Sequence, residues 1–130
     1  MAITKNVGRQ DILVARVEFG YADLTSGSFE AAAELPPNAE VVGGELVIDT
    51  VFDSGTSDTL TVGDSSSGGR YASGIDGQSA ARTALTPTGY RYTGRDNVGI
   101  TWTGAGTAPS QGAGHLNVQY IIKDRAVETE

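Results

Sequence analysis

The chain has 130 residues, 18 of them glycine, no cysteine, and a formal net charge of −7. A chain of this length forms one domain around a single core, and the lack of cysteine excludes disulfides, thiolate zinc sites and cysteine nucleophiles. The negative charge argues against nucleic-acid binding, which needs clustered Lys and Arg, and no apolar run is long enough for a membrane-spanning helix.

The N-terminal part is predicted to be a polar arm followed by two strands. Residues 1–10 are mostly polar and carry no secretory signal, so we predict an arm whose order depends on a neighbour. From residue 12 to residue 21 the apolar side chains occupy the odd positions, which is the two-residue period of a strand. Residues 29–35, FEAAAEL, contain helix formers but also alternate. Because they lie between a Ser-Gly turn and two prolines, we predict a strand there too.

The segment of residues 35–63 contains two further strands with their turns. Residues 36–38, Pro-Pro-Asn, form a turn, because proline fixes φ and asparagine tolerates unusual backbone angles. Apolar and polar side chains then alternate over residues 45–52, which predicts a half-buried strand. A second, shorter strand is predicted over residues 59–62.

The second half of the chain is predicted to be a long loop followed by short strands. Residues 64–79 are polar and rich in glycine, with only Tyr71 and Ile75 as apolar anchors, and we predict a long exposed connection. The strands that follow are predicted at residues 82–85, 90–93, 98–103 and 115–123. The tail of residues 125–130 is predicted to be loose.

About eight short strands separated by turns predict an all-β domain, an antiparallel β-sandwich of jelly-roll type. The domain organisation is then an arm of residues 1–10, one sandwich of residues 11–124 and a tail of residues 125–130. An immunoglobulin-like sandwich is the alternative, although the cysteine pair and the companion tryptophan spacing of that fold are absent.

One motif imitates a catalytic site. The run Asp53-Ser54-Gly55-Thr56-Ser57 follows a predicted strand and resembles the active-site signature of pepsin-like and retroviral aspartic proteases. In that family two such aspartates share a proton, so a single copy here requires a homodimer. No convincing glycine-rich flap follows, and residues 97–99 poorly match the expected downstream motif. Because Asp-Ser-Gly is also a common turn sequence, the pattern favours a plain turn over a catalytic Asp53.

Metal-binding candidates are equally weak. The acidic residues that could supply oxygens for Ca²⁺ are Asp49, Asp53, Asp58 and Asp64. Their spacing matches no EF-hand or RTX repeat, so turn capping is the simpler interpretation. His115 is the only histidine, which excludes a multi-histidine zinc site within one chain, and no nucleophile elbow accompanies it. We therefore assign no catalytic, cofactor-binding or metal-binding residue, and predict that His115 faces outward from the last strand.

Aromatic residues suggest a different kind of site. Stacking of sugars on exposed rings would make the chain a glycan-binding module, and the candidates are Tyr71, Tyr90, Tyr92 and Trp102. A small sandwich also needs large aromatic side chains to fill the space between its sheets. Core packing is therefore the favoured use of these residues.

Three segments, residues 35–64, 84–93 and 100–122, resemble the small structural proteins encoded near the major capsid gene of tailed bacteriophages. Several such proteins are head decoration, or cement, proteins: jelly-roll-like domains, often trimeric, that bind outside the capsid lattice and staple neighbouring subunits. Others of similar size belong to the tail or fibre. The resemblance rests on strand and turn texture across most of the chain and on no catalytic signature.

The resemblance implies a capsid decoration protein with no enzymatic activity and no cofactor. Its expected partners are the major capsid protein and sister copies in a homotrimer, with neither nucleic acid nor membrane. Its expected location is the capsid surface of the virion, after synthesis in the host cytoplasm. We expect the arm of residues 1–10 and the loop of residues 64–79 to contact capsid or sister subunits.

The charge is unevenly distributed along the chain. Residues 1–64 carry 11 acids and 3 bases (−8), whereas residues 65–130 carry 5 acids and 6 bases (+1). This asymmetry permits complementary contacts between copies, and solvated charges explain it equally well.

Overall fold

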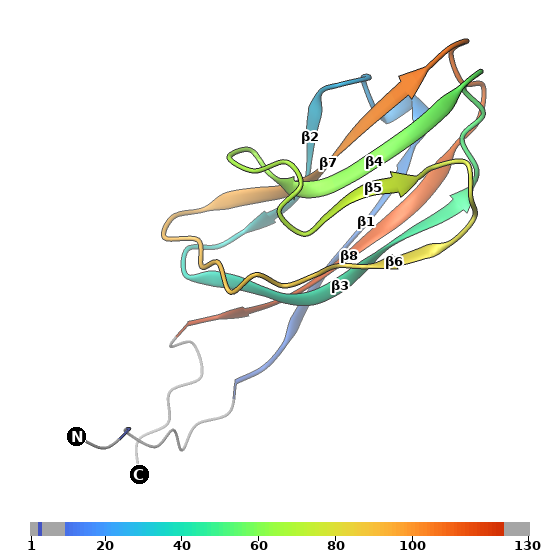
Figure 1. The fold of residues 1–130 in the computed structure, drawn as a ribbon. Coiled ribbons are helices and arrows are strands. Elements are labelled where there is room, and N and C mark those ends of the chain that lie inside the picture. Colours follow the sequence, from blue (N-terminus) through green and yellow to red (C-terminus); the bar gives the residue numbers. More distant parts are fainter. Residues whose placement is uncertain (1–2, 4–9, 124–130) are drawn as a thin grey trace.

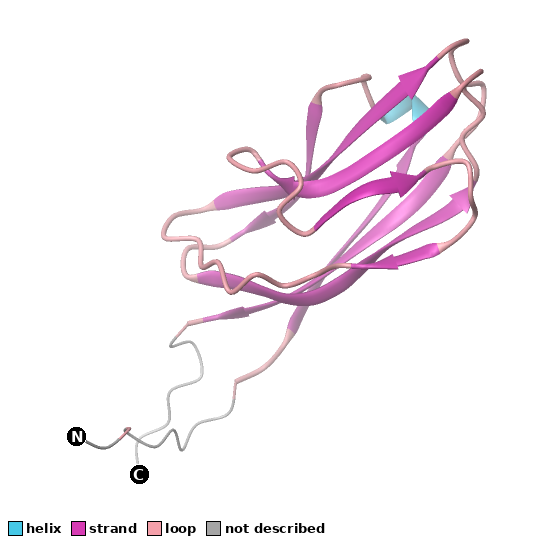
Figure 2. Ribbon diagram, viewed as in Figure 1, coloured by secondary structure: helices cyan, strands magenta, loops and turns pink. Residues whose placement is uncertain are grey.

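The computed structural model describes residue 3 and residues 10–123. Most of the predicted arm, and the tail of residues 125–130, lie outside the described residues. The described part forms eight strands and one short 3₁₀ helix, arranged as two antiparallel sheets that face each other (Figures 1 and 2). No helix among the described residues is long and apolar enough to cross a membrane.

Each sheet has four strands. The first contains, in spatial order, β1 (Leu13–Gly20), β8 (Ala113–Ile122), β3 (Ala39–Thr50) and β6 (Arg82–Ala84). The second contains β2 (Phe29–Leu35), β7 (Asp96–Ala105), β4 (Ser57–Asp64) and β5 (Ala72–Asp76). The short helix η1 (Tyr21–Asp23) links β1 to β2.

The connectivity identifies the type of sandwich. The first strand pairs with the last, so that Leu13 lies opposite Tyr120, and the first three connections each cross from one sheet to the other. Eight strands wound in this way form a jelly roll. The predicted fold class is therefore confirmed, and the immunoglobulin-like alternative is wrong.

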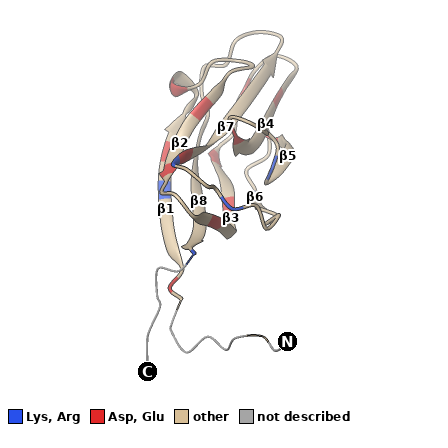
Figure 3. Ribbon diagram, turned by 90° about the vertical axis from the view of Figure 1, so that its left-hand side faces the viewer, with Lys and Arg blue, Asp and Glu red and all other residues tan. Residues whose placement is uncertain are grey.

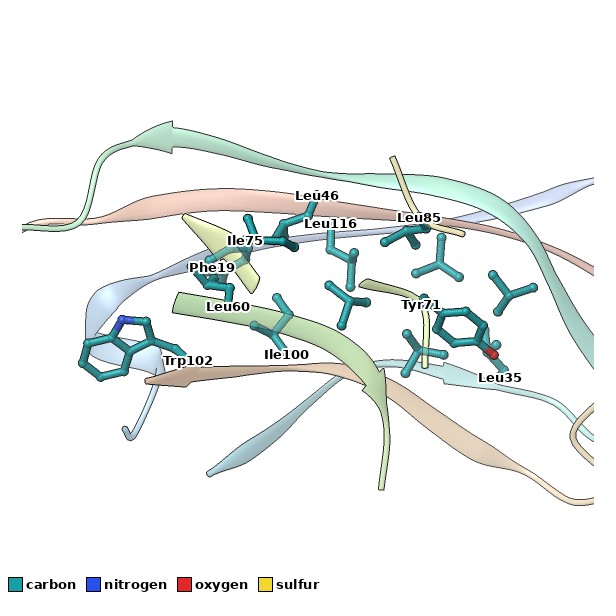
Figure 4. Close-up of a cluster of buried hydrophobic side chains, with 14 of the residues drawn as sticks. Phe19, Leu35, Leu46, Leu60, Tyr71, Ile75, Leu85, Ile100, Trp102 and Leu116 are labelled. Carbon is teal, nitrogen blue, oxygen red and sulfur yellow. The ribbon is translucent and has the colours of Figure 1, made fainter. Parts of the chain in front are cut away.

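The core lies between the sheets and is built by the alternation that the sequence predicted. In β4 and β7, Leu60, Val62, Ile100 and Trp102 point inward and are at most 6% exposed. The opposite sheet supplies Phe19, Leu46, Ile48, Leu116 and Val118. Figure 4 shows Leu60 and Ile100 from one sheet and Leu46 and Leu116 from the other pointing into the space between the sheets. Fully burying a large apolar side chain contributes about 2 kcal/mol, so this layer is the main source of stability.

The strand predicted at residues 45–52 is longer and starts earlier in the structure. β3 begins at Ala39, directly after the turn, and the register against β8 shifts between Val41 and Gly43. Before the shift the buried side chains of β3 are at odd positions, and after it they are at even positions. A strict two-residue period therefore does not continue through the whole strand. Gly44 has a φ of +131°, and a Cβ there would lie 2.2 Å from the Asn117 carbonyl oxygen. Only glycine allows the two backbones to approach so closely.

Two other predictions are corrected. Residues 64–79 are not one long exposed loop, because they contain β5, and Tyr71 and Ile75 are buried. Residues 90–93 form no strand but a single bridge between Arg91 and Glu40. The remaining predicted strands differ from the observed ones by two residues or fewer at each end, with residues 29–35 matching β2 at both ends.

Candidate functional site

Asp53 closes a loop at one end of the sandwich. Its carboxylate accepts hydrogen bonds from the backbone N–H of Ser110 (2.7 Å), the Ser110 hydroxyl (2.7 Å) and the Gln111 N–H (3.2 Å). The hydroxyl and backbone donors of Ser110 lower the pKa of this exposed carboxyl. The arrangement ties the turn after β3 to the loop before β8. The predicted turn role of Asp53 is therefore what the geometry supports.

Asp58 carries a buried carboxylate. From the sequence we expected this residue only to cap a turn beside a short strand. It lies inside β4, is 1% exposed, and accepts hydrogen bonds from Ser54, Gln78 and the indole N–H of Trp102 (2.9 Å). Burial opposes its ionisation, but these donors outweigh burial and leave the pKa of the carboxyl below its usual value. The Asp58 carboxylate therefore holds together the loop after β3, the loop after β5 and strand β7.

Asp64 holds a second buried cluster at the far end of β4. Its carboxylate accepts from the backbone N–H groups of Ser66 and Ser67, from Arg70 (2.6 Å) and from the Tyr92 hydroxyl (2.8 Å). Burial opposes ionisation of Asp64 as well, and the Arg70 and Tyr92 hydrogen bonds more than compensate, so that its pKa is lowered. The carboxylate fixes the turn after β4 and anchors Arg70.

The hydroxyl of Tyr92 continues this cluster into the core. Burial raises the pKa of Tyr92, so the hydroxyl keeps its proton and donates it to Asp64. The Tyr71 hydroxyl lies 2.6 Å from that of Tyr92 and is therefore the donor of the pair. The Arg70 guanidinium also covers the Tyr90 ring at 3.8 Å from its centroid. This cluster joins Tyr71, which precedes β5, to the segment after β6.

The four aspartates proposed as calcium candidates do not converge. Asp53, Asp58 and Asp64 each use their carboxylate oxygens on separate protein donors, and Asp49 pairs with Nδ1 of His115 at 2.8 Å. The described residues contain no group of three or more acidic or histidine side chains placed to share a metal ion. His115 points outward from β8, as predicted.

The aromatic residues do not form a sugar-stacking platform. Trp102, Tyr71 and Tyr92 are 6%, 2% and 2% exposed, and Trp102 stacks on the ring of Phe52 at a centroid distance of 6.0 Å. Of the four candidates, Tyr90 alone, at 42%, presents a substantial aromatic surface. The prediction of core packing is therefore confirmed for Trp102, Tyr71 and Tyr92.

The two outer faces of the sandwich have different chemistry. On the first sheet, Glu45 of β3 pairs with Arg82 of β6 and accepts from Asn117 of β8. Arg16 and Glu18 of β1 add a further exposed ion pair at 3.4 Å. Such pairs are screened by water and contribute little to stability, but they give this face a dense pattern of both charges.

The outer face of the second sheet is neutral at its centre. Thr59 and Thr61 of β4 lie opposite Thr103 and Thr101 of β7, and these four side chains alternate with the buried Leu60 and Trp102. Glycine occupies the next paired positions, Gly63 and Gly99. Both glycines are buried, because the loop at Ser67 and Gly68 covers Gly63 and the Phe29 ring lies against Gly99. The exposed part of this face is therefore an uncharged patch of threonine side chains. Nothing in the sequence marked this surface, because threonine and glycine were interpreted only as strand and turn residues.

Comparison with known proteins gives a consistent architectural match. No protein-family model matches the chain, and no curated protein does. Among solved structures, a chain of the cyanophage Pam1 capsid asymmetric unit superposes with a TM-score of 0.69 at 22% identity, covering 94% of this chain and 91% of that one.

Two further capsid structures agree with this match. A chain of the acid-stable capsid of Helicobacter pylori bacteriophage KHP30 gives a TM-score of 0.71 at 20% identity, covering 95% of this chain and 99% of that one. A chain of the Ralstonia phage GP4 capsid gives 0.64 at 19% identity, covering 94% and 90%. The three neighbours therefore share the fold of this chain over nearly their whole length.

Proposed function

We propose that this protein is a structural component of a tailed-bacteriophage virion, namely a decoration or cement protein on the outside of the head. The observation that carries the proposal is the whole-chain match to chains of three phage capsids, each covered to at least 90%. Each of those chains is accordingly a sandwich of about this size with little added to it. A shared fold alone is compatible with other roles, so the proposal also needs support from the surface.

The surface chemistry supports binding rather than catalysis. The aspartates that looked catalytic or metal-binding are engaged in fastening loops and strands, as Asp53 and Asp58 illustrate. No buried side-chain nitrogen or oxygen in the described residues lacks a hydrogen-bond partner. A rigid scaffold with broad faces of different chemistry suits lattice contacts, because many weak contacts repeated over a shell add up to stable attachment.

The finer features belong to the same proposal. The partners would be the major capsid protein and two sister copies in a homotrimer, and the protein would reach the capsid surface after synthesis in the host cytoplasm. It would perform no reaction. A tail or fibre location is the alternative position in the virion for a sandwich of this size.

The decisive measurement is the location of the chain in purified particles. Particles of the phage that encodes the chain are purified, separated into heads and tails, and analysed by mass spectrometry. We expect the chain in the head fraction, in an amount that is a simple multiple of the capsid subunits. Its absence from particles would contradict a virion role, and its confinement to tails would contradict decoration of the head.

Enzymatic activity is tested separately through Asp53. The chain and its Asp53→Asn variant are incubated with a mixed peptide library between pH 3 and pH 7. We expect no cleavage by either protein. Peptide cleavage at acid pH by the unmodified chain that disappears in the variant would overturn the non-enzymatic proposal and favour a homodimeric aspartic protease.

A further inference from the structure

A groove opens between the two sheets along the side of the sandwich where β1 and β2 lie. Its apolar floor is made by five residues, Val17 and Phe19 of β1, Leu24 after η1, Ala32 of β2 and Ile100 of β7. The acidic residues that line it are Glu18, Asp23 and Glu30. The groove encloses about 210 Å³, and acidic positions follow both strands (Figure 3).

The strands that border the groove are the two sheet edges on this side. Among the described residues, β1 pairs with β8 alone and β2 with β7 alone. β1 offers eight residues with no register shift, which is the kind of long regular edge that accepts an added strand. β2 is interrupted by a shift between Ala31 and Ala33, so it is a poorer template. An added strand is therefore expected along β1.

One carboxylate in the groove is left without a partner within the described part of the chain. Glu30 is half-buried, and its carboxylate has no hydrogen-bond or ion-pair partner among residues 10–123. The arginines of that part already engage other groups: Arg16 with Glu18 and Asn117, Arg70 with Asp64, Arg82 with Glu45, Arg91 with Asn38 and Arg95 with Glu34. The Arg16–Glu18 contact is exposed and long, at 3.4 Å. A cation that pairs with Glu30 would therefore be supplied from outside the described residues.

We propose that the groove receives residues 1–9 of a neighbouring copy, paired as an extra strand with the free edge of β1. This segment, MAITKNVGR, carries Lys5 and Arg9 and no acidic residue. In an extended strand the odd positions Ile3, Lys5, Val7 and Arg9 share one face, because successive side chains alternate. That face offers apolar side chains to the floor and cations to Glu30, which lies opposite the inward-facing Ile100 of β7.

The copy's own arm cannot fill the groove in this way. Residues 10–12 form no turn in the structure, so any reversal of the chain must lie before Gln10. The tightest possible reversal is a two-residue hairpin turn at residues 8 and 9, which would pair residue 7 with residue 10. In that register Met1 would lie opposite Arg16, and no residue of the arm would reach further along β1. The groove begins at Val17 and extends to Leu24. A neighbour's arm has no such limit, since nine extended residues span about 30 Å.

Self-association of the purified chain tests the inference without a capsid, so its failure is distinguishable from failure of the virion role. Sedimentation velocity is compared for the unmodified chain, for K5E/R9E, for E30K and for the variant that combines all three changes. We expect the unmodified chain to associate. K5E/R9E and E30K should each weaken association at least about tenfold, and the combined variant should recover most of it, because complementary charges are restored.

A matched control and a binding map complete the experiment. Glu34→Lys reverses an acid on the same strand, outside the groove, and should leave association unchanged. A peptide of residues 1–10 added to the chain lacking residues 1–9 should shift NMR signals of Val17, Leu24 and Glu30. A chain that stays monomeric at millimolar concentration, charge reversals without effect, or peptide shifts confined to another face would each overturn the inference.

Discussion

Asp58 and Asp64 show how far residue-level reasoning from the sequence reaches. The sequence indicated that both aspartates bracket a strand and cap turns, and Asp64 does bind the N–H groups of Ser66 and Ser67. It could not indicate that both carboxylates are buried, because their partners Gln78, Tyr92 and Trp102 come from distant segments. A carboxylate on an apolar strand face can be buried only if hydrogen-bond donors pair with its oxygens. The sequence does not show which residues supply those donors.

Removing the charge of Asp64 should destabilise the fold. In Asp64→Asn the Arg70 guanidinium loses a buried ion pair. In either orientation the amide N–H₂ faces groups that are themselves donors, either the Tyr92 hydroxyl or the backbone N–H groups of Ser66 and Ser67. We expect a loss of about 3 kcal/mol in the free energy of unfolding, measured by urea titration. Glu34→Gln removes an exposed partner of Arg95 and is the control, expected within about 0.5 kcal/mol of the unmodified chain. Equal losses in both variants would contradict the assigned role.

The lowered pKa values of Asp58 and Asp64 predict acid lability with a defined sign. Because each folded-state pKa lies below the unfolded value of about 3.9, ionisation stabilises the fold above that pH. This stabilisation is lost as the pH falls below about 4 and through the folded-state pKa.

Asp58→Asn isolates one of these contributions. The variant should be less stable than the unmodified chain at pH 7, and the difference should narrow as the pH falls below about 4. Thermal unfolding followed by circular dichroism between pH 2 and pH 7 measures both curves. A difference that stays constant over this range would show that ionisation of Asp58 does not contribute to stability.

At the scale of elements, the sequence predicted strands well where a strict two-residue period and a hard stop coincide. Residues 29–35 become β2 despite their helix-forming alanines, because two prolines end the segment and the alternation places Ala33 and Leu35 inward. The start of β3 was missed since the register shift next to Gly44 reverses the inward face. β5 was missed because its pairing partner β4, rather than its own apolar content, makes it a strand.

Gly44 is the position where an element depends on one residue. Gly44→Ala would place a Cβ about 2.2 Å from the Asn117 carbonyl oxygen, at a φ of +131° that side chains rarely adopt. We expect a loss of about 3 kcal/mol in unfolding free energy, measured by urea titration, because either the β3–β8 pairing or the backbone must shift. Gly94→Ala is the control, since nothing lies within 4 Å of a Cβ there. Comparable stability of the two variants would contradict the close approach.

At the scale of the whole molecule, the architecture was predictable because strand count, turn spacing and the absence of cysteine leave few all-β arrangements. The distribution of chemistry over the surface was not predictable. The charged face of β1, β8, β3 and β6, the neutral threonine face of β4 and β7, and the acidic groove between the sheets each combine residues from several strands. The topology that brings these strands together also makes the fold depend on its last strand.

β8 should be indispensable for folding, whereas residues 124–130 should not. β8 lies between β1 and β3 in its sheet, and its pairing joins Leu13 to Tyr120, so no local set of strands can form that sheet without it. A chain that ends at Gly112 should therefore show no cooperative thermal transition by circular dichroism. A chain that ends at Lys123 should melt within a few degrees of the full chain. Because the closing contacts are distant in sequence, refolding of the full chain should take milliseconds to seconds in stopped-flow fluorescence of Trp102. Cooperative unfolding of the chain that ends at Gly112 would show that the sandwich is not a single folding unit.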